Sequence, residues 1–433
     1  MGLNVEVIKK KVISTASKIS KNKYLSSISE ALTSVMPVLM LGSFATLFAN
    51  LNIDSYQNFI QRTGLKQVFQ IPGSVLITLL SIYAVFFIAY RLVSNLNPKA
   101  DNAGAGLIGL MSFFILTPIT KVDEVNAFTF NYLGAQGLFV AIIVGLVVGK
   151  LYVMIINRNL IIKMPKGVPP TVAKTFANLI PGTIIVIVFT MISYLSSLTD
   201  FGSLHQMIYT SIQAPLQNIG GGYWSLVIFV FVVQLLWFFG IHGFMVVSPI
   251  FYSVWLPLGL ANLDAISRGE AHTNILSGGF YNSFVVIGGS GATLGLAILL
   301  AFFAKSKRYK TLGRLAFPAS IFSINEPIIF GIPLVLNPFM FIPFVFGPII
   351  VSSFAYWSMN LGIFPIANGT HFPAGTPIIL NSFVNGGIRL VVLQLMCIAL
   401  QVIIYYPFFR IIDKKSIEDE QNAITQGADN VTV

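Results

Sequence analysis

The sequence predicts an all-α polytopic membrane protein with about ten transmembrane helices and two re-entrant hairpins. Of its 433 residues, 55% are hydrophobic and only 9% are charged, whereas about 25% are charged in an ordinary soluble domain. The apolar residues recur in runs long enough to cross the hydrocarbon layer as helices, which takes about 20 residues each. An outer-membrane barrel would instead alternate in segments of about 10 residues. The composition excludes a soluble globular enzyme.

The apolar runs between helix breakers define the expected spans in chain order. A basic segment, residues 1–23, precedes the first span. The apolar stretch after it is too long for a signal peptide and has no clear small-residue cleavage site, so we expect a retained span. The spans are expected near residues 27–50, 72–95, 104–120, 133–156, 178–198, 223–245, 247–263, 283–304, 338–361 and 387–409.

The basic residues orient these spans. Cytoplasmic loops of membrane proteins are enriched in Lys and Arg. With ten spans, four basic blocks fall on one side of the membrane, and they lie within residues 9–23, 158–174, 305–314 and 410–415. Both termini should therefore be cytoplasmic.

A polar, proline-rich segment divides the chain. Met164–Pro170 opens an amphipathic stretch, 164–182, with a helix expected from about Thr171. It would link two membrane halves, 24–163 and 183–415, although an ordinary loop between helices is the alternative. The tail, 416–433, is short and polar and is expected to be disordered. No room is left for a catalytic or nucleotide-binding domain, so a partner or a gradient would supply energy.

Two apolar regions are too broken by proline and glycine to be simple spans. They are residues 315–337, with Pro318, Pro327 and Pro333, and residues 363–386, with Pro365, Pro373 and Pro377. Non-helical backbone at membrane depth is tolerated only where protein buries it or where it lines a wet cavity. Transporters use such segments to build binding sites near the bilayer midplane. Both regions are therefore predicted to be re-entrant hairpins facing a substrate cavity.

Glu326 is an isolated acid within the first broken region. An acid inside the membrane is costly unless it is paired or hydrated, which makes it a candidate functional residue. The preceding Asn325 and following Pro327 form a turn that would aim the carboxylate away from regular helix. The alternative is a structural role, as the partner of Arg389 or as a backbone cap.

His242 and Trp237 form a second candidate pair. His242 lies between Gly240 and Gly243, and glycines allow close approach of another backbone or a ligand. Its imidazole can hydrogen-bond a hydroxyl or move a proton, although an isolated histidine among apolar residues is often structural. Trp237 offers a flat face for a sugar ring, although aromatic residues are also common at the bilayer interface.

Other residue patterns argue against alternative chemistries. The single cysteine, Cys397, allows no disulfide or cysteine cluster within one chain. The four histidines are far apart in sequence, so neither a metal site nor a cofactor is expected. His272 and His371 are further pore-lining candidates. The run Ile287–Gly295 lacks the strand and the Gly-Lys-Ser ending of a phosphate loop, and we interpret it as close helix packing.

Four motifs in order resemble those of a known family. The chain is similar to the sugar-specific enzyme IIC membrane subunits of the bacterial phosphoenolpyruvate-dependent phosphotransferase system (PTS), in the lactose/cellobiose/diacetylchitobiose branch. The resemblance covers nearly the whole chain. The motifs are Met164–Pro170 with Phe176–Gly182, Gly240–Gly243, Ile287–Gly291 and Ile324–Gly331.

The resemblance implies a function and a set of partners. Such a subunit is a component of the bacterial inner membrane that pairs into a homodimer through its N-terminal half and binds sugar, such as a β-linked disaccharide or β-glucoside, in its C-terminal half. It presents the sugar's 6-hydroxyl to a separate IIB subunit, which donates phosphate from a phosphocysteine. The chain would then be the membrane component of a phosphotransferase complex, with lipid, sugar and IIB as partners and no nucleic acid.

The resemblance also carries roles onto residues of this chain. His242 and Glu326 would hold the 6-hydroxyl, Asn325 would support them, and Trp237 would line the sugar. Asn282, His371 and Arg91 are additional candidate substrate contacts. One departure concerns the sugar, because Ala374 stands where relatives that carry β-linked disaccharides commonly have tryptophan. The chief alternative function is a proton- or sodium-coupled sugar transporter that uses Glu326 and His242 for coupling.

Overall fold

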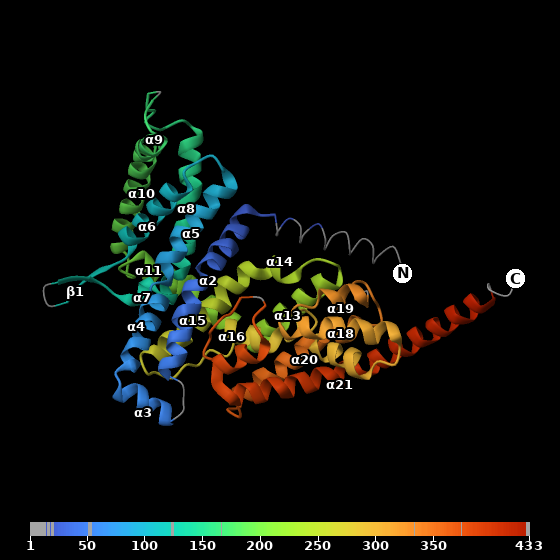
Figure 1. The fold of residues 1–433 in the computed structure, drawn as a ribbon. Helices are drawn as coiled ribbons and strands as arrows, with labels where there is room; N and C mark the ends of the chain where they lie inside the picture. Colours follow the sequence, from blue (N-terminus) through green and yellow to red (C-terminus); the bar gives the residue numbers. More distant parts are fainter. Residues whose placement is uncertain are drawn as a thin grey trace. The chain divides into compact units, whose positions relative to one another are not determined.

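The computed structural model describes residues 14, 18, 21–50, 54–122, 125–165, 167–332, 334–373 and 375–429. Most of the predicted basic segment, 1–23, and Ala374 lie outside these residues. The described chain is almost wholly helical (Figure 1). Its contacts form two compact units, an N-terminal unit (Lys18–Gly221 with Ser248–His272) and a C-terminal unit (Gly222–Val247 with Thr273–Val433).

The boundary between these units differs from the linker expected over 164–182. The helix after that linker belongs to the N-terminal unit, and so does the later segment Ser248–His272. The chain therefore passes between units at Gly221–Gly222 and twice more, after Val247 and after His272. This division by contacts does not assign dimerisation or substrate binding to either half, and those roles stay predictions.

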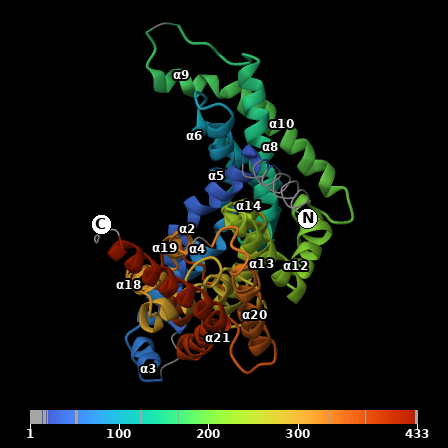
Figure 2. The same ribbon diagram turned by 90° about the vertical axis from the view of Figure 1, so that its right-hand side faces the viewer.

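Small residues bring the helices of the N-terminal unit together. On α8, a side chain added at Gly145 would lie 2.8 Å from Ile88 of α5, and one added at Gly149 would lie 3.0 Å from Leu92. Close backbone approach at small residues is a common way to pack helices in a membrane. As a result α5, α6 and α8 run side by side (Figures 1 and 2). The elements of this unit are α2 (Lys23–Asn50), α3 (Asp54–Arg62), α4 (Leu65–Thr78), α5 (Leu80–Leu96), α6 (Asn102–Leu116), β1 (Ile119–Val122), β2 (Val125–Phe128), α7 (Phe130–Leu133), η1 (Ala135–Gly137), α8 (Leu138–Asn157), α9 (Pro170–Ala177), α10 (Leu179–Ser197), α11 (Leu204–Ile208), η2 (Tyr209–Gln213), α12 (Ala214–Gly220), η3 (Phe251–Trp255) and α15 (Leu256–Ser267).

A short strand pair departs from the all-α prediction. β1 and β2 are antiparallel, with Ile119 opposite Phe128. The span expected over 104–120 is shorter than predicted, because α6 ends at Leu116 and Thr117 is already extended. β-branched and aromatic residues favour extended backbone, and they are frequent in both strands.

Hydrogen bonds join the predicted linker helix to its neighbours. α9 begins at Pro170, one residue before the predicted start, with proline in its first turn. Asn178, which follows α9, donates to the Asp101 carboxylate at 2.7 Å and accepts from the Tyr152 hydroxyl at 2.5 Å. The start of α10 is thereby tied to α6 and α8 within the N-terminal unit.

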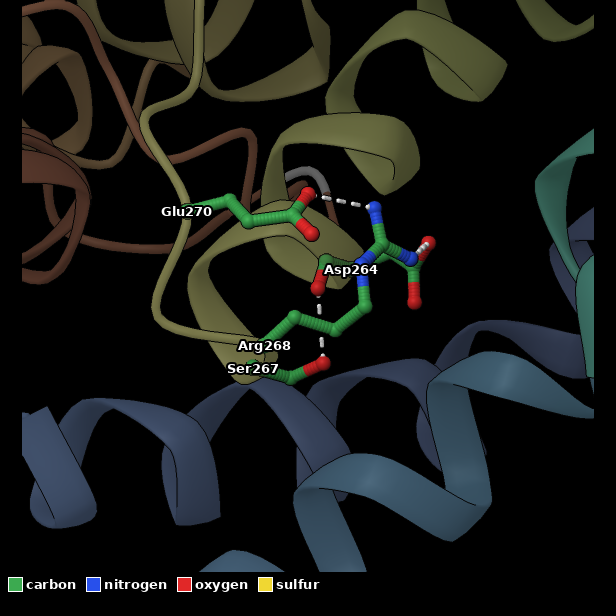
Figure 3. A network of polar contacts seen from close by, with 4 residues as sticks. All are labelled: Asp264, Ser267, Arg268 and Glu270. Carbon is green, nitrogen blue, oxygen red and sulfur yellow. Dashed lines mark hydrogen bonds and ion pairs between the residues drawn. The ribbon is translucent and has the colours of Figure 1, made fainter.

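A charged network ends α15, outside the apolar part of that helix. The Arg268 guanidinium donates to the carboxylates of Asp264 and Glu270, the latter at 2.9 Å (Figure 3). The Ser267 hydroxyl donates to the Asp264 carbonyl at 2.7 Å. Arg268 holds the pKa of the Glu270 carboxyl below its ordinary value, chiefly through this hydrogen bond.

A cluster of buried apolar side chains lies within the C-terminal unit. α13, α17, η5, α18, α19, α20 and α21 contribute to it, and Phe238, Leu300, Ile328, Phe344 and Tyr405 are among its buried members. Aromatic side chains bury large apolar areas, and Phe238 packs edge-on against Phe341 with ring centroids 4.8 Å apart. The elements are α13 (Tyr223–Phe238), α14 (Gly243–Ile250), whose last residues enter the N-terminal unit, α16 (Gly278–Phe280), η4 (Tyr281–Val285), α17 (Leu294–Ile298), η5 (Leu299–Phe303), α18 (Lys307–Ile321), α19 (Glu326–Gly331), α20 (Phe341–Asn360) and α21 (Ile378–Asp429).

The span expected over 283–304 is interrupted, which corrects the prediction. Residues 286–293 form a loop between η4 and α17. Gly288, Gly289 and Gly291 have φ of +78°, +91° and +82°, and Ala292 has φ of +51°. Glycine adopts positive φ without steric cost, so residues 286–293 bend the chain. The helix packing predicted for the run holds at Gly295, where an added side chain would lie 2.6 Å from the Gln401 backbone of α21. We call residues 286–293 the glycine loop.

α21 contains a sharp break and continues beyond the predicted last span. Gly386 and Gly387 have non-helical backbone angles, which divide α21 into two helical parts. The second part passes through Ser416, where a disordered tail was expected. Glu420 explains the difference, because its carboxylate accepts the backbone N–H groups of Lys307 and Arg308 at 3.1 and 2.9 Å and thereby caps α18.

The described helices support a multi-pass membrane protein. Six are long and apolar enough to span a membrane, and α11–α12 with α13 form a bent pair that adds one candidate. Three shorter apolar helices, Leu80–Leu96, Asn102–Leu116 and Leu294–Phe303, lie at expected spans. The predicted helical membrane architecture is confirmed at this level.

Candidate functional site

The end of α13 places Trp237 and His242 together. Gly240 has φ of +80°, and the N–H of Ile241 bonds to the Leu236 carbonyl at 2.9 Å, which is the Schellman arrangement. A side chain at Gly243 would lie 2.1 Å from the Val233 carbonyl oxygen, so only glycine fits there. The turn brings the Trp237 and His242 ring centroids to 4.6 Å.

The His242 side chain is exposed and caps α14. Its Nδ1 accepts the Met245 backbone N–H at 3.4 Å. In a neutral imidazole one ring nitrogen accepts and the other carries the proton. When the imidazole is neutral and Nδ1 accepts this N–H, the proton lies on Nε2, which can then donate to a ligand.

A tight turn between α18 and α19 exposes Glu326. Ser323 adopts φ of +58°, and the Asn325 carbonyl accepts the N–H groups of Ile328 and Ile329 at 2.9 and 3.0 Å. Asn325 is buried, whereas Glu326, the first residue of α19, is exposed. Arg389 is not its ion-pair partner among the described residues, since that guanidinium donates to the Ile363 carbonyl at 2.9 Å. The predicted turn is present, and the carboxylate is left available.

His242 and Glu326 lie on turns of the same unit, and the Leu336 N–H, in the segment after α19, bonds to the Phe238 carbonyl at the end of α13 at 3.0 Å. His242 and Glu326 come from segments more than 80 positions apart in the sequence, and both side chains are exposed. A hydrogen-bond donor beside an acceptor is suited to hold a hydroxyl group. The described residues contain no group of three His, Cys, Asp or Glu side chains that could hold a metal ion.

The second broken region contains His371 and is held by Asn282. The Asn282 amide donates to the Phe372 carbonyl at 2.6 Å. The His371 side chain packs directly on Gly278, where an added side chain would lie 2.5 Å from His371 Cβ. Both residues therefore fix the segment beside Pro373 in this structure, and their contact with substrate stays a prediction.

Arg91 belongs to the N-terminal unit and lies in a polar seam between α2 and α5. Its guanidinium donates to the Ser34 hydroxyl at 3.0 Å. One turn further along α5, Asn95 donates to Ser27 at 2.9 Å and to the Glu30 carboxylate at 3.3 Å. The seam pairs polar groups of the two helices but leaves the buried Arg91 Nε without a hydrogen-bond partner among the described residues, and the predicted substrate contact of Arg91 is not tested.

Sequence reasoning missed the residues that hold the glycine loop. Thr293, Gln234 and Tyr405 are buried and hydrogen-bond within or to this loop. The signal was the run of glycines itself, which can indicate either helix packing or a loop of positive φ.

Taken together, the long apolar helices and the breaks between them define a multi-pass helical membrane protein. The model of the phosphotransferase system EIIC family matches residues 29–348. The chain therefore belongs to the EIIC family, in its lactose/cellobiose/chitobiose branch. The resemblance seen in the sequence is confirmed.

Three proteins illustrate the similarity. The oligo-beta-mannoside-specific EIIC component of Bacillus subtilis (strain 168) is 34% identical over 429 residues, covering 97% of each chain. The lactose-specific EIICB component of Staphylococcus aureus (strain N315) is 30% identical over 420 residues, which cover 95% of this chain and 73% of that protein. The crystal structure of the transporter ChbC, the IIC component of the N,N'-diacetylchitobiose-specific phosphotransferase system, superposes with a TM-score of 0.90 at 34% identity, covering 96% of this chain and 99% of that one. In the lactose-specific relative, the EIIC part is joined to a B component.

Proposed function

We propose that this EIIC subunit carries a β-linked disaccharide or β-glucoside across the bacterial inner membrane and presents its 6-hydroxyl to a IIB subunit. The observation that carries the proposal is that His242 and Glu326 are both exposed on turns of one unit, after α13 and before α19, and that the Leu336 N–H after α19 bonds to the Phe238 carbonyl at the end of α13 at 3.0 Å. The named sugars of the relatives, β-mannosides, lactose and N,N'-diacetylchitobiose, support a β-linked disaccharide.

The two side chains take different parts in this proposal. His242 donates its Nε2–H to the sugar O6, because its Nδ1 already accepts the Met245 N–H. Glu326 accepts the proton of the 6-hydroxyl as the O6–P bond forms and the bond between phosphorus and the IIB cysteine sulfur breaks. Phosphoryl transfer depends mainly on positioning and charge stabilisation, which two fixed groups can supply.

Trp237 lines the sugar in this proposal. Its ring lies against His242, and its buried indole N–H has no hydrogen-bond partner among the described residues. Buried indole N–H groups usually find an acceptor, so a sugar hydroxyl would satisfy this one. Asn282, His371 and Arg91 remain proposed substrate contacts, to be tested by sugar binding to their alanine variants.

The proposed architecture has ten spans, two re-entrant hairpins at 315–337 and 363–386, and cytoplasmic termini. Six long apolar helices, one bent pair and three shorter apolar helices together equal the proposed number of spans. An even number places both termini on one side, and the basic blocks place that side in the cytoplasm. The subunit is proposed to dimerise through residues 24–163.

Uptake in cells tests the function. Cells expressing the chain, with or without a functional phosphoenolpyruvate relay, receive radiolabelled cellobiose, β-mannobiose, lactose or N,N'-diacetylchitobiose, and the intracellular product is separated by chromatography. The proposal expects a 6-phosphorylated sugar only with the relay. Free sugar that accumulates without the relay and collapses with the proton gradient would instead establish a gradient-driven transporter.

A further inference from the structure

The glycine loop is fixed to the turn that carries Glu326. The Asn325 amide donates to the Ser290 carbonyl at 2.5 Å and to the Thr293 hydroxyl at 2.9 Å. The Ser323 hydroxyl donates to the Val286 carbonyl at 2.8 Å. A side chain at Gly289 would lie 2.5 Å from the Asn325 carboxamide carbon, so the amide rests directly on the loop backbone.

Thr293 connects Asn325 to the start of the bend. Its hydroxyl accepts from Asn325 and donates to the Gly288 carbonyl at 2.7 Å. The residue is fully buried. Because a hydroxyl has one proton and accepts through its lone pairs, the donation to Gly288 directs those lone pairs to receive the Asn325 N–H.

Two side chains from other helices hold the loop from its other side. Gln234 of α13 accepts the Gly291 N–H at 2.8 Å, and the Tyr405 hydroxyl of α21 donates to the Gly291 carbonyl at 2.6 Å. Both side chains are buried, with exposed fractions of 0% for Gln234 and 1% for Tyr405. The peptide groups of Gly291 are thus anchored to α13 and α21, and α13 is also the helix whose end positions His242.

We propose that Thr293, together with Gln234 and Tyr405, positions Glu326 for proton acceptance. This inference rests on the proposed function. The contacts form a continuous path from α13 and α21, through Gly291 and Thr293, to Asn325 and the adjacent Glu326. All three side chains are buried, so we assign them no contact with the sugar. They fix the place of the carboxylate, so their loss acts on turnover more than on sugar affinity.

Positioning of this kind has a large kinetic effect. Misplacement of a reacting group by about 1 Å can cost roughly a hundredfold in rate. The Asn325 amide has both described hydrogen bonds on the glycine loop. Without the Thr293 hydroxyl, one N–H of the Asn325 amide loses its acceptor. The turn that carries Glu326 is then held by fewer hydrogen bonds.

The test compares two variants. Thr293→Val keeps the shape of the side chain but removes its hydroxyl, whereas Thr293→Ser keeps the hydroxyl and removes the methyl group. Purified variants in vesicles are supplied with the phosphorylated IIB relay and with cellobiose, β-mannobiose and lactose separately. The sugar that wild type phosphorylates fastest gives kcat and KM, and equilibrium binding without the relay gives Kd. We expect Thr293→Val to lower kcat about tenfold or more, with less than threefold change in Kd, and Thr293→Ser to keep wild-type kcat.

Ser352→Ala is the matched control, because it removes a buried hydroxyl of α20 that bonds only to the Ile349 carbonyl in its own helix. A Thr293→Val variant with the kinetics of Ser352→Ala would overturn the inference. So would equal losses in kcat and Kd that Thr293→Ser does not recover. Should Thr293→Val fail to fold, Tyr405→Phe decides, since it removes only the hydroxyl on Gly291 and is expected to lower kcat in the same way.

The same experiment separates this inference from the proposed function. Wild type and Glu326→Gln are assayed in parallel. If wild type phosphorylates none of the sugars when the relay is present, the proposed function fails. If wild type is active and Glu326→Gln is impaired while Thr293→Val and Tyr405→Phe keep wild-type kcat, only the positioning role is wrong.

Discussion

The two regions broken by proline and glycine, 315–337 and 363–386, each use a buried asparagine to hydrogen-bond irregular backbone, but they leave different groups exposed. In the first, Asn325 ties a turn to the glycine loop. In the second, Asn385 donates to the carbonyls of Thr370 and Asn381 at 3.0 and 2.9 Å and accepts the Gly369 N–H at 3.2 Å. Both asparagines are buried. A carboxamide can donate and accept at once, so it can replace the missing partners of irregular backbone.

The regions differ in what they leave exposed. The first contains the exposed Glu326 carboxylate, whereas residues 361–387 contain no Asp, Glu, Lys or Arg. Irregular backbone inside a membrane protein must be satisfied internally in either case. We infer that the first region supplies the reactive carboxylate, whereas the second region holds the backbone around the site in a fixed conformation. Variants of each region should therefore change different quantities.

Glu326→Gln should have the largest effect. The amide cannot accept the hydroxyl proton, so relay-dependent phosphorylation should fall by about a hundredfold or more, with the melting temperature of the purified protein unchanged. Glu270→Gln is the control, because it removes an exposed carboxylate outside the C-terminal unit. Loss of folded protein with Glu326→Gln would favour a structural role for this acid.

Asn385→Leu should lower the thermal stability of the protein. It leaves the Gly369 N–H and the Thr370 carbonyl without their partner, at about 1–3 kcal/mol for each buried group. Thermal unfolding in detergent should show a clear fall in melting temperature relative to Asn360→Leu, an exposed position on α20. A wild-type melting temperature with altered phosphorylation would contradict the division into reactive and shaping regions.

Trp237→Ala should weaken sugar binding by roughly tenfold, since an aromatic contact contributes about 0.5–1.5 kcal/mol beyond its buried area. Equilibrium binding of the transported disaccharide measures the change. Trp224→Ala is the matched control on the same helix, where the side chain is 72% exposed. Unchanged affinity of Trp237→Ala would remove this ring from the site.

Arg268→Gln should have the smallest effect. Arg268 lowers the pKa of the exposed Glu270 carboxyl, so any stabilisation is present above the ordinary carboxyl pKa of about 4.3 and is lost as pH falls through the lowered value. Exposed ion pairs contribute little, and melting at pH 7 should match wild type closely. A large loss at pH 7, or a difference that persists in acid, would show another role.

The sequence allowed prediction of the helical membrane class, the family and the turn at Asn325–Glu326, because hydrophobic runs and proline–glycine breaks are local signals. It did not reveal the glycine loop, since Gly288–Gly291 could equally have marked helix packing. The bonds of Gln234 and Tyr405 to Gly291 join residues 57 and 114 positions apart, and no local pattern records such pairs. The helix over 416–429 was missed because its anchor, the bond of Glu420 to the start of α18, is also distant in sequence.

The most direct measurement compares binding of the transported disaccharide with that of its 6′-deoxy analogue, in wild type and in Glu326→Ala. If Glu326 binds the 6-hydroxyl, removal of that hydroxyl weakens binding to wild type and leaves binding to Glu326→Ala nearly unchanged, because hydroxyl and carboxylate are coupled. Equal weakening in both proteins would show that the carboxylate does not contact this hydroxyl, and would contradict the role assigned to Glu326.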